Sequence, residues 1–91
     1  MKFDKLIQQL EILIYIFKNK KVELRTLSTE FNLSYQTIHF LIEKWRKEGY
    51  IEKNRKEILI LGGDKFEYRL NEQSRKLIIN LINRLKILKT D

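Results

Sequence analysis

The 91-residue sequence contains no cysteine and no proline, and it has a single histidine. Without cysteine the chain forms neither a disulfide framework nor a thiolate metal site, and one histidine cannot supply a multi-histidine site. We therefore expect no metal and no cofactor. Residues 6–17 come nearest to the ~18 apolar residues of a membrane span, but Gln8, Gln9 and Glu11 interrupt them. The expectation is a cytoplasmic protein with no membrane partner.

Residues that would support catalysis are equally scarce. His39 has no identifiable serine or cysteine partner in the sequence. Gly62 and Gly63 fall in a predicted turn between strands, whereas a phosphate-binding glycine loop lies between a strand and a helix. We expect that the protein is not an enzyme.

Basic residues exceed acidic ones by 19 to 12, which gives a net charge of +7. This excess favours a polyanionic partner such as nucleic acid. It is unevenly placed, because residues 22–49 hold four basic and four acidic side chains. The length predicts a single domain over residues 1–91, and so small a domain would gain stability from burial in a dimer.

Residues 34–48 are predicted to form a helix with two chemically different faces. Ser34 is a favourable N-cap, and Gly49 suits the left-handed position that ends a helix. Helical spacing places four apolar residues on one side, which we expect to be core: Ile38, Leu41, Ile42 and Trp45. The opposite side carries Gln36, Phe40, Glu43 and Lys47, flanked by His39 and Lys44.

The second face has the chemistry of a DNA-recognition helix. Gln36 can bond bidentately to adenine, and Thr37 and Phe40 can meet a thymine methyl group. We expect base contacts from Tyr35, Gln36, Thr37, His39 and Phe40. We expect backbone contacts from Ser34, Lys44, Lys47, Arg55, Lys56 and Lys65. The alternative is a merely solvated face, although solvation gives no reason for an exposed Phe40.

The residues before this helix predict a helix-turn-helix. Leu24, Leu27 and Phe31 mark one face of a short helix over residues 24–31, and Asn32 suits a left-handed turn. Such spacing lets a first helix brace a second one in the major groove. A plain helical hairpin is the alternative. Val22, just upstream, is expected to form one short strand.

A first helix is predicted over residues 4–18, with Asp4 as its cap. Its apolar side is wide, because Ile12, Tyr15 and Ile16 fall outside the main stripe that runs from Phe3 to Phe17. These three residues are expected either at a subunit interface or partly buried within the monomer.

After Gly49 the apolar period changes from 3.6 to 2, which predicts a β-hairpin over residues 57–70. Asn71 then caps a long helix over residues 71–89. This helix has a coiled-coil rhythm at Ser74, Ile78, Leu81, Leu85 and Leu88. The predicted dimer interface comprises Ile12, Tyr15, Ile16, Ile78, Leu81, Leu85 and Leu88.

The predicted order of elements resembles a winged helix-turn-helix domain, mainly α with a small β-hairpin and a long C-terminal dimerisation helix. The run SYQTIHFLIEKWRKEGYI at residues 34–51 resembles the recognition helix and exit of MarR-type transcriptional regulators. Tyr68-Arg69-Leu70-Asn71-Glu72 resembles their strand-to-helix junction after the wing. The resemblance covers residues 24–72, and the whole chain is also similar to small winged-helix proteins of thermophilic archaea and their viruses.

This resemblance implies a sequence-specific double-stranded DNA-binding protein that acts in transcription as a homodimer on an inverted repeat. The sequence departs from the MarR pattern, since Phe40 stands where a basic residue is frequent and Ser74 where glycine is usual. No residues specify a small-molecule effector. The alternative is a winged-helix module that docks on a protein, which the neutral charge of residues 22–49 favours.

Overall fold

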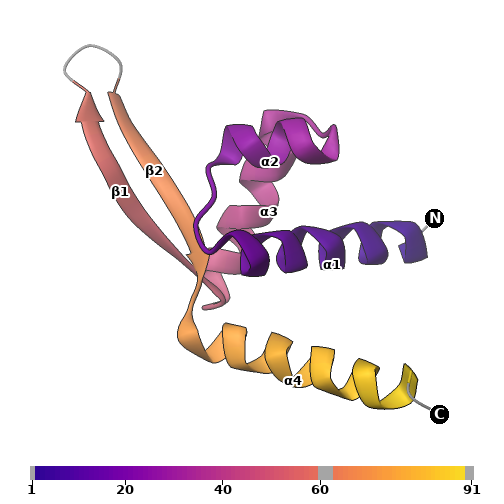
Figure 1. The fold of residues 1–91 in the computed structure, drawn as a ribbon. Coiled ribbons are helices and arrows are strands. Elements are labelled where there is room, and N and C mark those ends of the chain that lie inside the picture. Colours follow the sequence, from indigo (N-terminus) through magenta and orange to yellow (C-terminus); the bar gives the residue numbers. More distant parts are fainter. Residues whose placement is uncertain (1, 60–62, 90–91) are drawn as a thin grey trace.

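A computed structural model describes the backbone of residues 2–59 and 63–89, and the side chains of residues 2–55 and 66–86. Figure 1 shows a helical body from which a hairpin projects. In chain order the elements are α1 (Lys2–Asn19), α2 (Leu24–Phe31), α3 (Tyr35–Lys47), β1 (Ile51–Leu59), β2 (Gly63–Leu70) and α4 (Glu72–Lys89). This confirms the mainly helical winged-helix architecture predicted from the sequence.

Two predicted boundaries were wrong. Helix α1 begins at Lys2, so Asp4 lies within its first turn and is not its N-cap. A carboxylate in the first turn interacts favourably with the helix dipole. Strand β1 begins at Ile51 and not at residue 57. The early start follows from burial, because Ile51 pairs with Leu70 of β2 and both side chains lie in the core.

The hairpin is antiparallel, with β1 paired to β2 from Ile51↔Leu70 outward and a register shift between Arg55 and Glu57. Val22 joins it on the other side of β2. The backbone N–H of Val22 donates to Tyr68 O at 2.8 Å, and the N–H of Tyr68 donates to Val22 O at 2.7 Å. The short strand predicted at Val22 is thus a single bridge that fixes the hairpin base to the helical body.

The core lies between α1, α2, α3 and the hairpin base. Its buried members are Ile12, Ile16, Val22, Leu24, Leu27, Ile38, Leu41, Ile42, Trp45, Ile51, Tyr68 and Leu70. The four core residues predicted for the α3 face, Trp45 included, are all confirmed as buried.

Helix α1 is oriented differently from the sequence prediction. Ile12 and Ile16 have 0% exposure, so their assignment to a dimer interface was wrong. They occupy the side of α1 that the other core residues cover. Tyr15 is half-buried, with its ring edge-on to Phe31 at 5.5 Å between centroids. The N-terminal part of the main apolar stripe is exposed at Phe3, Leu6, Ile7 and Leu10, whereas Leu13 and Phe17 of the same stripe pack half-buried against the core.

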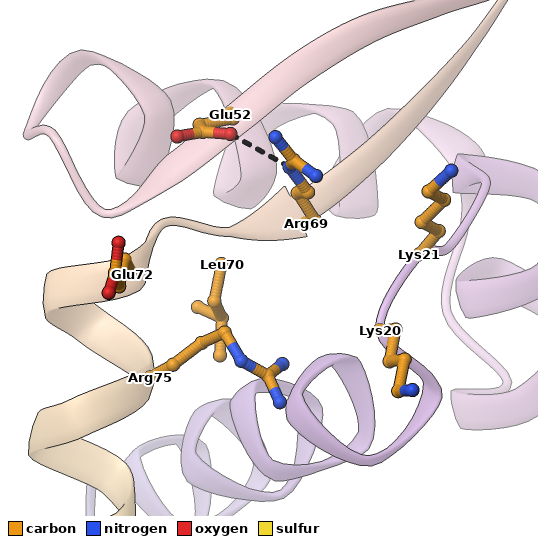
Figure 2. A pocket seen from close by; sticks show the side chains of 7 residues that line it. All are labelled: Lys20, Lys21, Glu52, Arg69, Leu70, Glu72 and Arg75. Atoms are coloured by element: carbon orange, nitrogen blue, oxygen red, sulfur yellow. Dashed lines mark hydrogen bonds and ion pairs between the residues drawn. The ribbon is translucent and has the colours of Figure 1, made fainter.

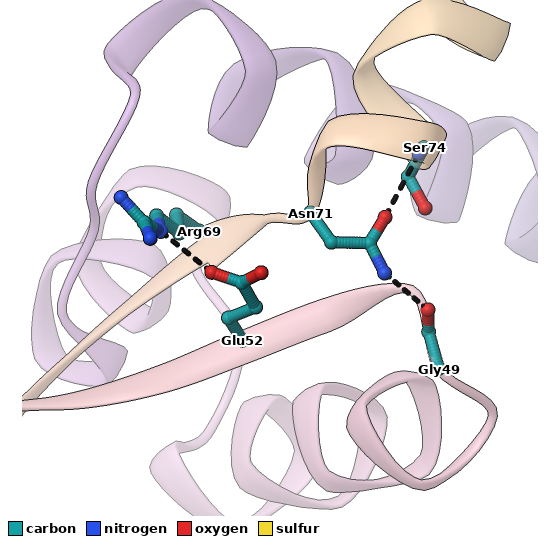
Figure 3. A network of polar contacts seen from close by, with 5 residues as sticks. All are labelled: Gly49, Glu52, Arg69, Asn71 and Ser74. Atoms are coloured by element: carbon teal, nitrogen blue, oxygen red, sulfur yellow. Dashed lines mark hydrogen bonds and ion pairs between the residues drawn. The ribbon is translucent and has the colours of Figure 1, made fainter.

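Helix α4 is attached at its start. Asn71 accepts a hydrogen bond from the backbone N–H of Ser74 at 2.8 Å, as its predicted N-cap role requires, and its side-chain amide donates to Gly49 O (Figure 3). Arg75 donates to Phe17 O at 3.3 Å and stacks over the Phe17 ring at 4.7 Å. These contacts join the first turn of α4 to the end of α1 and to the turn after α3.

Candidate nucleic-acid interface

Each helix of the helix-turn-helix is followed by a residue in left-handed conformation. Asn32 has φ 52° at the end of α2, and Gly49 has φ 89° after α3. Leu33 follows Asn32, donates its N–H to Ser28 O at 3.1 Å and packs half-buried against the core. The turn is therefore held locally by Ser28 and by burial of Leu33, which sets the angle between α2 and α3.

Ser34 begins α3 as predicted. Its Oγ accepts from the N–H of Thr37 at 3.1 Å, and the two hydroxyl oxygens lie 2.8 Å apart. This pairing satisfies a free N–H of the first turn and orients both side chains. The Thr37 hydroxyl is therefore already engaged, while its methyl group remains available for an apolar contact.

The N-terminal half of α3 brings together the five predicted base-contacting residues. Their side chains are exposed, and Phe40 has 68% exposure. Tyr35 and His39, one turn apart, stack with ring centroids 6.3 Å apart and planes 11° from parallel. This arrangement gives a surface of aromatic and amide groups on the side of α3 opposite the buried Ile38 and Ile42.

Glu43 lies on the same helix but is not a free contact group. Its carboxylate accepts from Nε and Nη2 of Arg46 at 3.1 and 2.8 Å. This hydrogen bonding lowers the pKa of Glu43 below its ordinary value, and it raises that of Arg46. The pair holds the one acidic group in the middle of α3 against a cation, so its charge is largely neutralised for an approaching polyanion.

Apart from Ser34, the predicted phosphate-contacting residues lie on the C-terminal half of α3 and on the hairpin. Lys44 and Lys47 are exposed on the C-terminal half of α3, and Arg55 is exposed on β1. The side chains of Lys56 and Lys65 lie outside the described residues. The backbone places Lys56 at the register shift of the hairpin and Lys65 opposite Glu57.

The β1–β2 hairpin is the wing of the winged-helix fold. Lys53 is a basic residue of this wing that the sequence prediction missed. Its Nζ lies over the Phe66 ring, 4.2 Å from the centroid. It shares with Arg55 the hairpin face that also carries Ile51, since side chains alternate along a strand. Recognition of the strand start at Ile51 would have found Lys53, because the period of 2 would then have linked all three residues.

Tyr68 occupies the junction between the wing and α3. It is buried beside Val22, and burial followed by the nearby Glu43 carboxylate raises its pKa above the ordinary value. The bridge to Val22 and the buried Tyr68 ring make the hairpin base a rigid extension of the helical body. The base of the wing and α3 consequently hold a fixed position relative to each other.

The remaining predicted dimer residues divide between core and surface. Ile78 is half-buried against the core, whereas Leu81 and Leu85 are exposed. The side chain of Leu88 lies outside the described residues.

No helix in the described part of the chain is long and apolar enough to cross a membrane. Residues 2–55 and 66–86, whose side chains the structure describes, also contain no cluster of three His, Asp or Glu side chains that could hold a metal ion.

The sequence matches a family model described as FeoC like transcriptional regulator over residues 9–64, which include α2, α3 and β1. The chain belongs to this family. No curated protein sequence matches the chain. Family membership and the geometry of α2 and α3 agree in identifying a winged-helix transcriptional regulator domain.

Solved structures share the fold. FabT of Streptococcus pneumoniae in complex with DNA superposes with a TM-score of 0.70 at 22% identity, covering 93% of this chain and 61% of that one. A transcriptional regulator homologue from Pyrococcus horikoshii superposes with a TM-score of 0.68 at 12% identity, and the match covers 88% of this chain and 77% of that one. A MarR family regulator from Silicibacter pomeroyi superposes with a TM-score of 0.66 at 14% identity, and the match covers 89% of this chain and 52% of the regulator.

Proposed function

We propose that this protein binds double-stranded DNA in a sequence-specific manner and regulates transcription as a homodimer on an inverted-repeat site. The observation that carries the proposal is the exposed N-terminal half of α3. Five side chains with hydrogen-bonding or apolar edges lie there on a helix that is capped at Ser34 and fixed from behind by core residues. In a helix-turn-helix, this half of the second helix contacts base edges.

Basic residues around α3 supply the second part of the proposal. Lys44 and Lys47 follow the base-contacting half, while Lys53 and Arg55 extend along the wing. Their positive charge suits phosphates on either side of a major groove. FabT, a fold neighbour, was solved in complex with DNA, which supports placing DNA on this kind of domain.

The dimer is proposed from apolar surface on α1 and α4. These helices run antiparallel in Figure 1, so the start of α1 and the end of α4 lie at the same end of the molecule. Both helices carry exposed apolar residues: Phe3, Leu6, Ile7 and Leu10 on α1, and Leu77, Ile79, Leu81 and Leu85 on α4. A second copy of the chain would cover this surface and place two α3 helices about a two-fold axis.

Selection of bound fragments from a random duplex pool tests the proposal directly. We expect an inverted repeat with half-site centres about 10 bp apart, or a multiple of this spacing. Footprinting of the selected site should protect both half-sites. Direct repeats, or protection of one isolated half-site, would contradict the dimer geometry.

Docking on a protein is the second candidate function. The 68% exposure of Phe40 and the equal numbers of acidic and basic residues over 22–49 favour it. A salt series separates the two functions, because affinity for duplex DNA falls steeply with ionic strength when phosphates are neutralised. Absence of duplex binding at low salt would support protein docking.

A further inference from the structure

A pocket of about 470 Å³ lies at the hairpin base, where the end of α1, the two strands and the start of α4 meet. Figure 2 shows the side chains that line it, and four of the seven are basic. We call it the basic pocket, and its lining residues are Lys20, Lys21, Glu52, Arg69, Leu70, Glu72 and Arg75.

The two acidic residues of the basic pocket have partners of their own. Glu52 accepts from Nε of Arg69 at 2.8 Å, and Glu72 lies 3.7 Å from Nζ of Lys76 outside the pocket lining. Lys20 and Lys21, by contrast, have no ion pair within the described part of the chain. The pocket therefore presents uncompensated positive charge.

Arg75 is set in place by a backbone hydrogen bond and a ring contact. Arg75 is held by Phe17, to whose carbonyl oxygen it donates and over whose ring it stacks. This contact leaves the guanidinium at the pocket wall beside the end of α1 (Figure 2). Lys20 adopts the left-handed conformation, with φ 64°, which glycine adopts without strain. Arg75 is thus the cation that is held in position, whereas the side chain of Lys20 is exposed.

The basic pocket is separate from the candidate DNA-binding face. It adjoins the hairpin base, which follows the C-terminal end of α3, whereas the predicted base contacts lie in the first half of α3. None of the basic pocket residues belongs to the predicted base- or phosphate-contacting set.

We propose that the basic pocket binds a small, multiply charged anion of the phosphate-ester or pyrophosphate class. Guanidinium groups match the oxygen geometry of phosphates, and lysines add point charge. The volume exceeds that of a single small ion and falls in the range of pockets for small metabolites. Six of the seven lining residues named above are charged and Leu70 is apolar, which favours a charged ligand.

Titration of the full chain with inorganic pyrophosphate, in the absence of DNA, tests this site. We expect saturable binding by calorimetry, with NMR amide shifts concentrated near Lys21, Leu70 and Arg75. The double variant Lys20→Gln with Lys21→Gln should weaken binding roughly tenfold, since two charge-assisted contacts are lost. Both lysines are exposed, so circular dichroism should show an unchanged fold.

The matched control removes two charges at the other end of α1, through Lys2→Gln with Lys5→Gln. It should bind pyrophosphate nearly as the wild type does. An equal loss in the control, or no saturable binding by the wild type, would overturn the proposal. So would a lower salt slope for duplex binding in the Lys20 and Lys21 variant, because the pocket would then be a DNA-phosphate contact. Pyrophosphate binding is measured without DNA, so its failure would not count against the proposed DNA binding.

Discussion

The side-chain amide of Asn71 donates a hydrogen bond to the carbonyl oxygen of Gly49. The same side chain caps α4 by accepting from Ser74 N–H at 2.8 Å, and the backbone N–H of Asn71 donates to Tyr50 O at 3.1 Å. One residue thus joins the turn that follows α3 to α4, the helix proposed to form the dimer (Figure 3). Movement of α4 relative to α3 would have to break this junction.

Substitution of Asn71 by alanine should destabilise the fold by about 1–2 kcal/mol, because both the N-cap and the bond to Gly49 are lost. Chemical denaturation of wild type and variant at one protein concentration measures the loss. Asn71→Asp is the matched control, since its carboxylate still caps α4 but cannot donate to Gly49. It should be less destabilising than alanine. Equal stability of Asn71→Ala and wild type would contradict the role of this junction.

The buried Tyr68 should make stability fall in alkaline solution. Its folded-state pKa lies above the ordinary value of 10.0, chiefly through burial. Above that pH the unfolded chain releases a proton that the folded chain keeps, so this contribution to stability is present below pH 10 and is lost as pH rises through the folded pKa.

Tyr68→Phe removes this titration. The stability difference between wild type and variant should shift against wild type above pH 10, by at most about 1.4 kcal/mol per pH unit. Urea unfolding between pH 8 and 11 measures it. Titration of lysines and the other tyrosines largely cancels between the two proteins. Parallel stability curves over this range would show that Tyr68 does not contribute.

Local signals predicted the helix-turn-helix well, whereas long-range packing was less visible. Three features depend only on residues that are close together in the sequence: the cap at Ser34, the left-handed positions at Asn32 and Gly49, and the apolar spacing of α3. The structure confirms all three. The strand start at Ile51 was missed because its burial depends on pairing with Leu70, far along the chain.

Helix α1 shows the limit of periodicity most clearly. It is apolar on two sides, and periodicity cannot tell which side the core covers. The sequence prediction placed Ile12 and Ile16 at a dimer interface, with burial in the monomer as the alternative, and both residues belong to the buried core. The basic pocket was missed for a related reason, because its lysines and arginines come from three separate elements.

The orientation of α1 can be tested by matched truncations. Ile12→Ala should cost about 2–5 kcal/mol, because a fully buried side chain leaves a cavity, and Ile12→Val about 0.5–1.5 kcal/mol if the alanine variant fails to fold. Leu6→Ala, at a site with 61% exposure, should change the stability of the monomer by less than about 0.5 kcal/mol. Denaturation at low protein concentration separates this from dimer effects. The opposite ranking would contradict the structure.

The proposed dimer should dissociate when charge is placed on the exposed apolar face of α4. Leu81 and Leu85 have 37% and 54% exposure, so Leu81→Asp with Leu85→Asp should disrupt the subunit contact without burying charge in the monomer. Light scattering at tens of micromolar should give a dimer mass for wild type and a monomer mass for the variant. Asn80→Asp with Asn83→Asp, a control of equal charge on exposed polar positions of α4, should stay dimeric. A wild-type monomer would refute the proposal.

The last prediction concerns the division of work along α3. Gln36 lies in the exposed first half, where a recognition helix meets base edges, and Lys47 lies at its end, nearer to phosphates. Gln36→Ala should cost about 1–3 kcal/mol on the selected site and little on random DNA. Lys47→Ala should weaken both alike and lower the salt slope by roughly one unit. Affinity measured on both duplexes over a salt series separates the two effects.

A triple alanine variant at Gln36, His39 and Phe40 provides the decisive comparison. All three side chains are exposed, so the helix should remain folded, with its cap at Ser34 and its buried face intact. Sequence readout by α3 requires this variant to lose most of its discrimination between selected and random duplexes while it keeps the salt-dependent affinity that Lys44 and Lys47 supply. A folded variant with full discrimination would mean that α3 does not read sequence, and the exposed Phe40 would then be better explained by a protein partner.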